Sequence, residues 1–386
     1  MLTQLQIHHI RNLEQITLQD LARINIFFGA NGSGKTSVLE AVHMLGMARS
    51  FRQGATRSLI THGKQDCTVY GLTTTATGSR GRVPVAVQRT LSGEVQIKLR
   101  GQAVRSVAEL LAHLPLQVIN AASFDLLTGA PAARRQFLNW GVFHVEQRFF
   151  AEWQRFQRCL KQRNKLLRHG KLVPSELSVW TRDLAVSGER IHEFRLRYFE
   201  ALAPSFRAIM ERLAPSLRGL ELRYRKGWEK SLSYGEALEV GSQADIEQGY
   251  THIGPQRADI KVTADGYSAA ETLSRGQQKL VVCGLKLAQG QLMSLIREDV
   301  SACVYLVDDL PAELDARHCT LVCEALEELQ AQVFITCVAK SDLEGLWPAG
   351  VAPAMFHVEH GGVHSAAIPD VEVEGAQISS REHQDL

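Results

Sequence analysis

Eight consecutive residues near the start of the chain have the types and spacing of a phosphate-binding loop. They match G-x-x-x-x-G-K-[ST] without a gap and are Gly29, Ala30, Asn31, Gly32, Ser33, Gly34, Lys35 and Thr36. Glycines let the backbone bend until successive N–H groups point at phosphate oxygens. The lysine of such a loop contacts the terminal phosphates, and the hydroxyl beside it binds Mg²⁺. The run therefore predicts a site for a nucleoside triphosphate and Mg²⁺, with Lys35 as a catalytic residue.

The segments on either side of this loop have the patterns of a strand and a helix. Residues 24–28 are mostly apolar and β-prone, whereas residues 37–45 place apolar side chains at helical spacing. A strand, a glycine loop and a helix in this order direct the positive end of the helix at the phosphates. This context distinguishes the motif from an ordinary glycine-rich turn.

A second apolar run supplies carboxylates. Residues 302–307 read as a buried strand and end in Asp308 and Asp309. We expect Asp308 to hold the Mg²⁺ shell at the strand tip, as the acidic residue of a Walker B motif does. Asp309 would then position or activate the attacking water and act as the second catalytic residue.

Residues 273–277 read L-S-R-G-Q and resemble the signature of ABC-type ATPases. Ser274 could cap the helix predicted from residue 280 onward. The pentapeptide lies about thirty residues before the acidic pair, and Ala312-Glu-Leu-Asp315 resembles the D-loop that follows Walker B in that class. The resemblance implies that ATP is the ligand and that Ser274 and Gly276 contact ATP held by a second copy, so that ATP closes a homodimer.

Composition excludes several classes of protein. The chain has 386 residues, 45% of them hydrophobic, and a net charge of +2, which is ordinary for a globular protein and excludes small disulfide scaffolds. No apolar window reaches the ~18 residues of a membrane span, and the first residues show no signal pattern. We therefore expect a cytoplasmic protein. Seven cysteines without C-x-x-C spacing favour reduced core thiols. The alternative, a zinc site at His318, Cys319 and Cys323, lacks a fourth ligand.

The spacing of the motifs predicts the domain organisation. About 270 residues separate the two nucleotide motifs, which is more than a transporter subunit needs and far less than a chromosome-maintenance coiled coil. We predict an α/β fold, an ABC-type P-loop ATPase head with an inserted, mainly helical lobe. Its parts would be 1–128 and 249–368 for the head, 129–248 for the lobe, and 369–386 for a disordered acidic tail. Helical spacing within the lobe runs over 149–167 and again over 191–202, where we expect Pro204 to interrupt it.

One part of the lobe is strongly basic. Residues 134–171 contain ten Lys or Arg against two Glu. Arg155, Arg158, Lys165 and Arg168 can share the helix face opposite an aromatic stripe, which reads as core. The segment is either a surface that tracks DNA phosphates or an ordinary solvated face.

The combined motifs resemble those of the RecF family, over roughly residues 1–365. Besides the ATPase motifs, the likeness rests on Ile10-Arg-Asn-Leu13, Ser50-Phe-Arg52, Lys161-Gln-Arg-Asn164, Gly227-Trp-Glu229 and the run 273–279. It implies a cytoplasmic DNA repair protein that binds gapped DNA and single-strand/double-strand junctions in an ATP-dependent manner. It further implies action with RecR and RecO in loading recombinase, in support of replication restart and SOS induction.

Several positions depart from the family pattern. Ala121 and Ala122 stand where a Pro-Glu pair is usual, Asn139 replaces Asp, Gln256 replaces His and Ala312 replaces Ser. We therefore expect slow, DNA-stimulated ATP turnover that serves as a dimer switch. Two alternatives remain, an ATP-binding scaffold with little turnover and a non-DNA ABC-type ATPase subunit. Neither Gln88 nor Gln117 has the context to be chosen as the Gln-loop residue.

Overall fold

The computed structural model describes residues 1–52, 56–74, 81–168, 174–296 and 303–366. Its centre is a six-stranded sheet in which all neighbouring strands are parallel except the pair β14 and β15. Side chains alternate between the faces of this sheet, so that Phe27 and Leu306 enter one core while Ile26 and Val307 enter the other. In spatial order the strands are β15 (Gly362–Ala366), β14 (Ala354–Glu359), β3 (Ile24–Phe28), β13 (Gln332–Cys337), β12 (Val304–Val307) and β8 (Leu116–Ile119).

Helix α1 (Lys35–Met47) packs between the central sheet and a second, antiparallel sheet. Nearly all of its side chains are buried because both of its sides face apolar strands. A methyl group on Gly46 would lie 2.3 Å from Leu116 Cδ1, so only glycine permits this close approach to β8. The antiparallel sheet consists of β2 (Leu13–Leu18), β1 (Leu2–Ile10), β4 (Asp66–Thr74), β5 (Arg82–Thr90), β6 (Val95–Leu99) and β7 (Gln102–Val104), and α2 (Val107–His113) lies beside α1.

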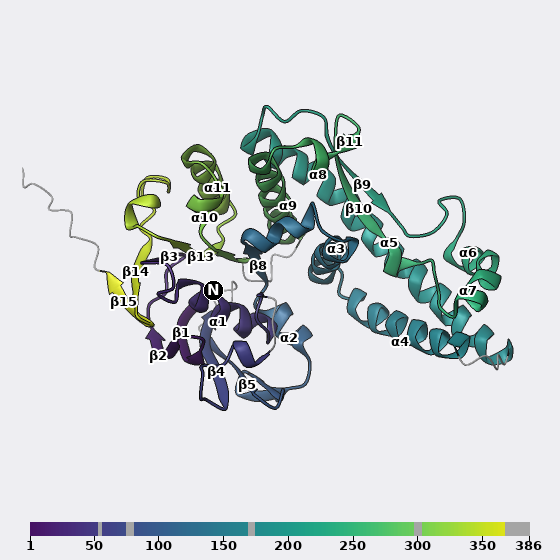
Figure 1. Cartoon of the computed structure of the whole chain (residues 1–386), viewed down its shortest axis with the longest axis horizontal. Coiled ribbons are helices and arrows are strands. Elements are labelled where there is room, and N and C mark those ends of the chain that lie inside the picture. Colours follow the sequence, from purple (N-terminus) through teal and green to yellow (C-terminus); the bar gives the residue numbers. More distant parts are fainter. Residues whose placement is uncertain (53–55, 75–80, 169–173, 297–302, 367–386) are drawn as a thin grey trace, which may run out of the picture.

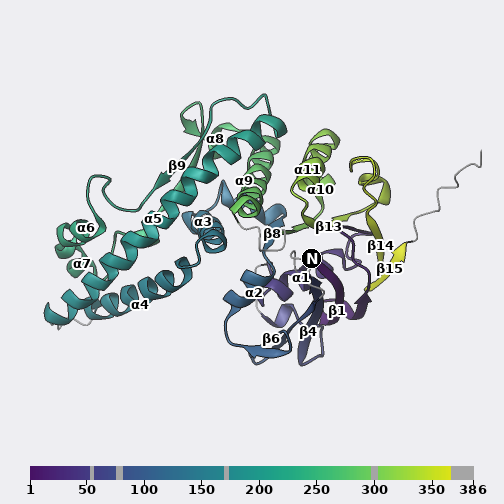
Figure 2. The same cartoon turned by 180° about the vertical axis from the view of Figure 1, so that it is seen from behind.

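Helices cover the other face of the central sheet and extend from it as a lobe (Figures 1 and 2). Helix α4 leads away from the sheet. Helix α5 packs beside it and leads back, so that its end packs on α9. The main helices are α3 (Pro131–Val145), α4 (Phe149–Arg168), α5 (Pro174–Leu213), α9 (Arg275–Ile296) and α11 (Ala316–Glu328). Smaller elements are η2 (Ala121–Leu126), α6 (Tyr234–Val240), α7 (Ser242–Gln248), α8 (Ala269–Thr272), α10 (Leu310–Glu313) and a sheet of β11 (Tyr267–Ser268), β10 (Asp259–Ala264) and β9 (Leu220–Arg225).

The expected interruption of the helix at Pro204 is wrong. Helix α5 continues past this proline and is 40 residues long. A proline inside a helix costs about 3 kcal/mol through a lost hydrogen bond and a clash. Leu202, Phe206 and Met210 are buried around it. Each such side chain contributes about 1.5–3 kcal/mol, so burial outweighs the local cost.

The predicted α/β class and ABC-type head are confirmed. The strand expected at 24–28 is β3, and the helices expected after Thr36 and over 149–167 are α1 and α4. Residues 129–248, predicted as the inserted lobe, contain α3 to α7 together with β9. The tail predicted at 369–386 lies outside the described residues, as does Lys171. Among the described helices, α9 alone has the length and apolar character of a membrane span, and it is mostly buried in the core.

Candidate nucleotide site

The predicted phosphate loop lies between β3 and α1, with its backbone in the left-handed region at three glycines. Gly29, Gly32 and Gly34 have φ angles of 151°, 81° and 121°. A side chain at Gly29 would place Cβ 2.2 Å from the Val358 carbonyl oxygen. Lys35 is buried, and its ammonium group donates hydrogen bonds to the carbonyls of Gly29 (2.6 Å) and Ala30 (3.0 Å). The loop is therefore shaped by glycine and closed by its own lysine.

Asn12 supports the loop from the turn between β1 and β2. Its Nδ2 donates to the Ser33 carbonyl at 3.0 Å, and its Oδ1 accepts from Ser37 Oγ at 3.0 Å. The Gly361 N–H donates to the same Ser33 carbonyl at 3.0 Å. Sequence reasoning noted Asn12 only as part of a family motif and did not assign it to the site. The contacts show that two hairpins, distant in sequence, fix the loop.

Thr36 and Asp308 meet as predicted for a Mg²⁺ site. Thr36 Oγ1 donates to Asp308 Oδ1 at 2.9 Å, across 272 positions of sequence. Thr336, at the end of β13, donates to the same oxygen at 2.9 Å and accepts from the Asp309 N–H at 2.8 Å. The sequence analysis does not assign Thr336 to the site. Its signal is the same as that of Asp308, since it is a polar residue at the end of an apolar run.

Asp309 adopts the left-handed conformation, with φ 57° and ψ 52°. Its carboxylate has no hydrogen-bond partner among the described residues, and burial followed by the charge of Asp308 raises its pKa above the ordinary value. A carboxylate with a raised pKa accepts a proton more readily at neutral pH than an ordinary aspartate does. Asp309 therefore has the chemistry expected of the water-activating residue.

The signature residues lie at an exposed helix start. Ser274 accepts a hydrogen bond from the Gln277 N–H at 3.3 Å, and its own N–H donates to Gln277 Oε1 at 2.9 Å, which confirms the predicted cap. Ser274 and Gly276 are exposed, and no atom lies within 4 Å of a Cβ built on Gly276. Figures 1 and 2 both place α8, which leads directly into this segment, apart from α1. The signature thus offers an open backbone surface away from its own phosphate loop.

The segment after Asp309 forms an ion pair with α9, the helix that follows the signature. Lys279 Nζ lies 2.7 Å from Glu313 Oε2, with both side chains about a quarter exposed. Asp315 caps α11 by accepting from the His318 N–H at 3.0 Å. Ala312, at a departure from the family pattern, is exposed. The predicted D-loop residues 312–315 therefore run from the end of α10 to the residue that caps α11.

The cysteines fit the prediction of core thiols, since all seven are free and buried. Burial raises the pKa of Cys67 and Cys319 to about 11. Within the described ranges no group of three or more His, Cys, Asp or Glu could hold a metal. Cys319 and Cys323 face the core, whereas the His318 ring pairs with Asp315, so these three side chains do not converge.

Gln117 is not free to contact the nucleotide because it lies inside the core on β8. Its Nε2 donates to Gln289 Oε1 at 3.0 Å, and its Oε1 accepts from Lys286 at 3.3 Å. Gln289 in turn donates to the Phe137 carbonyl and to Tyr198 Oη. Gln117 therefore connects β8 to α9 through hydrogen bonds. The alternative Gln88 lies within β5, paired with Thr68 of β4.

The basic segment divides into structural and exposed cations. Arg163 is buried and lies 2.6 Å from the Asp245 carboxylate, and Arg155 pairs with Asp183 at 2.9 Å. Arg158 and Arg168 are exposed on α4, as are Lys161 and Lys165. The aromatic stripe is core at Phe149 and Phe156, as expected, but Trp153 is only half-buried.

Two departures from the family pattern, at residues 139 and 256, form hydrogen bonds with residues outside the phosphate loop. Asn139 Oδ1 accepts two hydrogen bonds from the buried Arg195 guanidinium, at 3.0 and 2.8 Å, and burial lowers the pKa of Arg195 to about 10. Gln256 Nε2 donates to the Ile253 carbonyl at 2.7 Å. Ala121 and Ala122 lie in η2, which begins at the Asn120 cap directly after β8.

The donor set fits a triphosphate with Mg²⁺. Ser33 Oγ is buried and has no partner among the described residues, although it belongs to the loop that would hold phosphate oxygens. The Lys35 ammonium can exchange its two carbonyl contacts for phosphate, and Thr36 and Asp308 present the oxygen ligands that Mg²⁺ prefers. Together with the sheet order, this arrangement defines a nucleotide-binding head of the ABC type.

Comparison with known proteins narrows this class. The family model of the RecF/RecN/SMC N terminal domain matches residues 1–357. The DNA replication and repair protein RecF of Pseudomonas syringae pv. tomato is 48% identical over 362 residues, which cover 94% of this chain and 97% of that protein. RecF of Azotobacter vinelandii is 49% identical over 355 residues, covering 92% and 95%. The chain belongs to the RecF family.

Solved structures share the fold. A structure of the recombination mediator protein RecF with ATP superimposes with a TM-score of 0.81 at 23% identity, covering 95% of this chain and 97% of that one. An Smc head domain from Pyrococcus furiosus gives a TM-score of 0.56 at 15% identity, covering 95% and 96%. The head fold is therefore common to RecF and Smc proteins.

Proposed function

We propose that this chain is an ATP-switched DNA-binding recombination mediator that works as a homodimer in the cytoplasm. It recognises gapped DNA and single-strand/double-strand junctions and, with RecR- and RecO-like mediators, helps to load recombinase for repair, replication restart and the SOS response. The observation that carries the proposal is the assembled site in a RecF-family chain, in which Thr36 and Asp308 are joined at 2.9 Å.

The phosphate-loop and Walker B residues would hold and hydrolyse ATP. Lys35 and the N–H groups of residues 29–36 bind the phosphates, and Asp309 accepts a proton from the attacking water. Mg²⁺, when held by Thr36 and Asp308, would neutralise part of the phosphate charge. Thr336 fixes both aspartates from β13.

The exposed signature would act on the ATP of a second copy. Ser274 and Gly276 present a hydroxyl and an uncovered backbone at the N-terminus of α9, which suits an anion. Loss of the terminal phosphate removes the charge that this helix start binds, so hydrolysis opens the dimer. Turnover is slow because the family's usual Pro-Glu pair is Ala121-Ala122, which leaves one carboxylate fewer near the site.

The test is fluorescence anisotropy of a labelled gapped duplex titrated with Asp309→Asn protein at one salt concentration near physiological. The variant keeps the shape of the carboxylate but cannot accept the proton, so ATP persists. We expect tight binding with Mg·ATP and weak binding without it, and Lys35→Met should abolish the difference. Equal affinity for the gapped duplex with and without Mg·ATP would contradict the proposal and favour a scaffold role.

A further inference from the structure

Basic and aromatic side chains line opposite walls of a groove of about 1320 Å³ between the head and the lobe. One wall carries Arg49 and Arg52, which follow α1, and Arg89 of β5. The other wall carries Trp140, Phe143, Phe150 and Trp153 of α3 and α4. Figures 1 and 2 both place α3 and the start of α4 across from α1 and α2.

The charge of the groove is strongly one-sided. Five cationic side chains line it against a single carboxylate, Asp125, in a chain whose net charge is only +2. Arg11 and Arg52 lie 2.8 and 3.8 Å from the Glu40 carboxylate, but Arg49 is exposed and its guanidinium has no partner among the described residues. Lys286 adds an ammonium group beside the core glutamines. The groove therefore suits an extended anion.

The aromatic wall keeps ring surface available. Trp140, Phe143, Phe150 and Trp153 are each only half-buried, unlike Phe149 and Phe156 of α4. Trp153 already stacks on Phe149 and lies 5.4 Å from the Arg195 guanidinium, so the rings most open to a base are Phe143 and Phe150. Phe143 and Phe150 meet edge to face, with centroids 5.9 Å apart. The Trp140 indole N–H is buried and has no partner in the described part of the chain, so Trp140 contributes to the groove through its ring.

We propose that this groove binds single-stranded DNA, with the phosphates along the arginine wall and the bases stacked on the aromatic wall. Single strands expose the flat faces of their bases, whereas a duplex hides them, and proteins that bind single strands combine a positive groove with aromatic platforms. The volume also exceeds the 300–1,000 Å³ that is typical of pockets for small molecules. The inference rests on the proposed function and deepens it, by assigning the unpaired strand of a gap to one surface.

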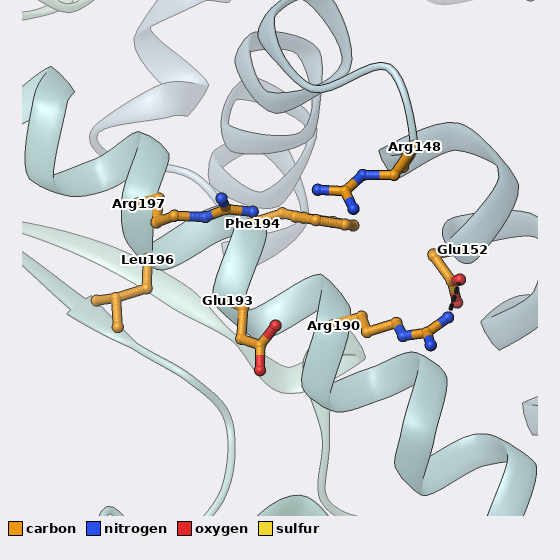
Figure 3. Close-up of a pocket in the computed structure, with 7 residues that line it drawn as sticks. All are labelled: Arg148, Glu152, Arg190, Glu193, Phe194, Leu196 and Arg197. Atoms are coloured by element: carbon orange, nitrogen blue, oxygen red, sulfur yellow. Dashed lines mark hydrogen bonds and ion pairs between the residues drawn. The ribbon is translucent and has the colours of Figure 1, made fainter.

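A second hollow, on the lobe, lacks these features (Figure 3). It is lined by three arginines and two glutamates, and Arg190 pairs with Glu152 at 2.6 Å. The guanidinium groups of Arg148 and Arg197 already cover Phe194, at 5.5 and 5.4 Å from the ring centre. Its arginines and its ring therefore have partners within the chain, which makes this hollow a suitable surface for comparison.

The experiment measures binding of fluorescein-labelled (dT)20 and of a labelled gapped duplex, both with Mg·ATP at fixed salt. Phe150→Ala should weaken (dT)20 binding by about 5-fold to 100-fold, the effect of losing one stacked base. Arg49→Gln should reduce the salt slope for the single strand by about 0.7. Unlabelled (dT)20 should quench tryptophan fluorescence, and Trp140→Phe should remove part of this quenching. Controls are the exposed Tyr267→Ala and Arg207→Gln, which lie outside the groove lining and outside the basic segment of residues 134–171.

The outcomes separate this inference from the proposed function. Unchanged (dT)20 affinity in Phe150→Ala and Arg49→Gln, with no tryptophan quenching, would overturn the groove assignment while ATP-dependent binding of the gapped duplex stands. Equal competition by poly-glutamate would also overturn it, because charge alone would then explain binding. If the unaltered protein bound neither DNA, the proposed function would fail and the groove assignment with it.

Discussion

The Thr336 hydroxyl lies 2.9 Å from Asp308 Oδ1, to which it donates a hydrogen bond, and the Asp309 N–H donates to the same hydroxyl. A single side chain of β13 thus orients both acidic residues of the neighbouring strand β12. Since Thr36 donates to the same Asp308 oxygen, the phosphate-loop helix and the acidic strand are held in one network.

Removal of the Thr336 hydroxyl should slow ATP hydrolysis without preventing ATP binding. Thr336→Val keeps the side-chain shape but leaves the Asp309 N–H and one Asp308 contact unsatisfied. We expect kcat to fall by about 10-fold to 100-fold with little change in KM, which corresponds to about 1.4–2.7 kcal/mol. Steady-state phosphate release measures this.

Thr336→Ser should restore most of the rate, because it returns the hydroxyl. Thr263→Val, on β10, is the matched control, since Thr263 is also a buried strand residue and its hydroxyl has no partner among the described residues. A rise in KM with unchanged kcat in Thr336→Val would show that Thr336 serves binding rather than the orientation of the aspartates.

Bulk at Ser274 should block dimer closure and leave ATP binding intact. Ser274 is exposed at the start of α9, apart from its own phosphate loop, so an arginine there would obstruct only a second copy. In an Asp309→Asn background, Ser274→Arg should remain monomeric with Mg·ATP in light scattering, while ATP affinity changes less than about 3-fold.

Ser233→Arg provides the control, because Ser233 is another exposed N-cap with a capping box, at the start of α6. Both substitutions remove a cap, at a cost of about 1 kcal/mol, but only Ser274 belongs to the signature. Normal ATP-driven dimerisation of the Ser274→Arg protein would refute contact in trans.

A carboxylate at position 139 should stabilise the protein. Arg195 is buried with its guanidinium held by the neutral Asn139 amide and the Pro255 carbonyl, and burial lowers its pKa to about 10. A buried cation without a counter-charge is costly, and the RecF family pattern has Asp at this position. Asn139→Asp should raise the free energy of unfolding by about 1–2 kcal/mol in urea titrations.

Asn139→Leu serves as the opposite control, since it removes the acceptor altogether and should destabilise the lobe by about 3 kcal/mol or more. The prediction is contradicted if Asn139→Asp is less stable than the unaltered chain at pH 7. Desolvation of the new carboxylate would then cost more free energy than its pairing with Arg195 returns.

Relative to Lys286→Met, the unaltered protein should gain stability as pH rises through the titration of Lys286. Burial lowers the pKa of this lysine from 10.5 to about 8. Between these pH values the unfolded chain binds the proton and the folded chain does not, so the free energy of unfolding increases with pH. Buried thiols such as Cys67 and Cys319, whose pKa is raised to about 11, lower the stability of both proteins as pH rises. Urea unfolding at pH 7 and pH 10 should therefore show a gain of up to about 3 kcal/mol for the unaltered protein relative to Lys286→Met.

The exposed Lys261→Met on β10 is the control and should retain the pH dependence of the unaltered protein. If Lys286→Met and the unaltered chain changed in stability by the same amount between pH 7 and pH 10, Lys286 would not contribute to the pH dependence.

Local sequence was sufficient for the phosphate loop, the acidic pair, the Ser274 cap and the helix of residues 149–168. Each depends on contacts within a few positions: glycine conformations, an apolar run that ends in a charge, or apolar side chains at helical spacing. Such patterns are readable because the interactions that produce them are short in sequence. The continuity of α5 through Pro204 could not be predicted from local sequence, because it depends on the burial of α5 against α9.

The tertiary structure alone decided which distant residues share the site and the groove. The order β3-β13-β12 inserts a strand between the two nucleotide motifs, and this brings Thr336 to Asp308. Strand order joins segments that are far apart along the chain. The support of Ser33 by Asn12 and the presence of Arg49 and Phe150 in one groove do the same. They result from packing two apolar faces of one sheet, a global condition that no local pattern records.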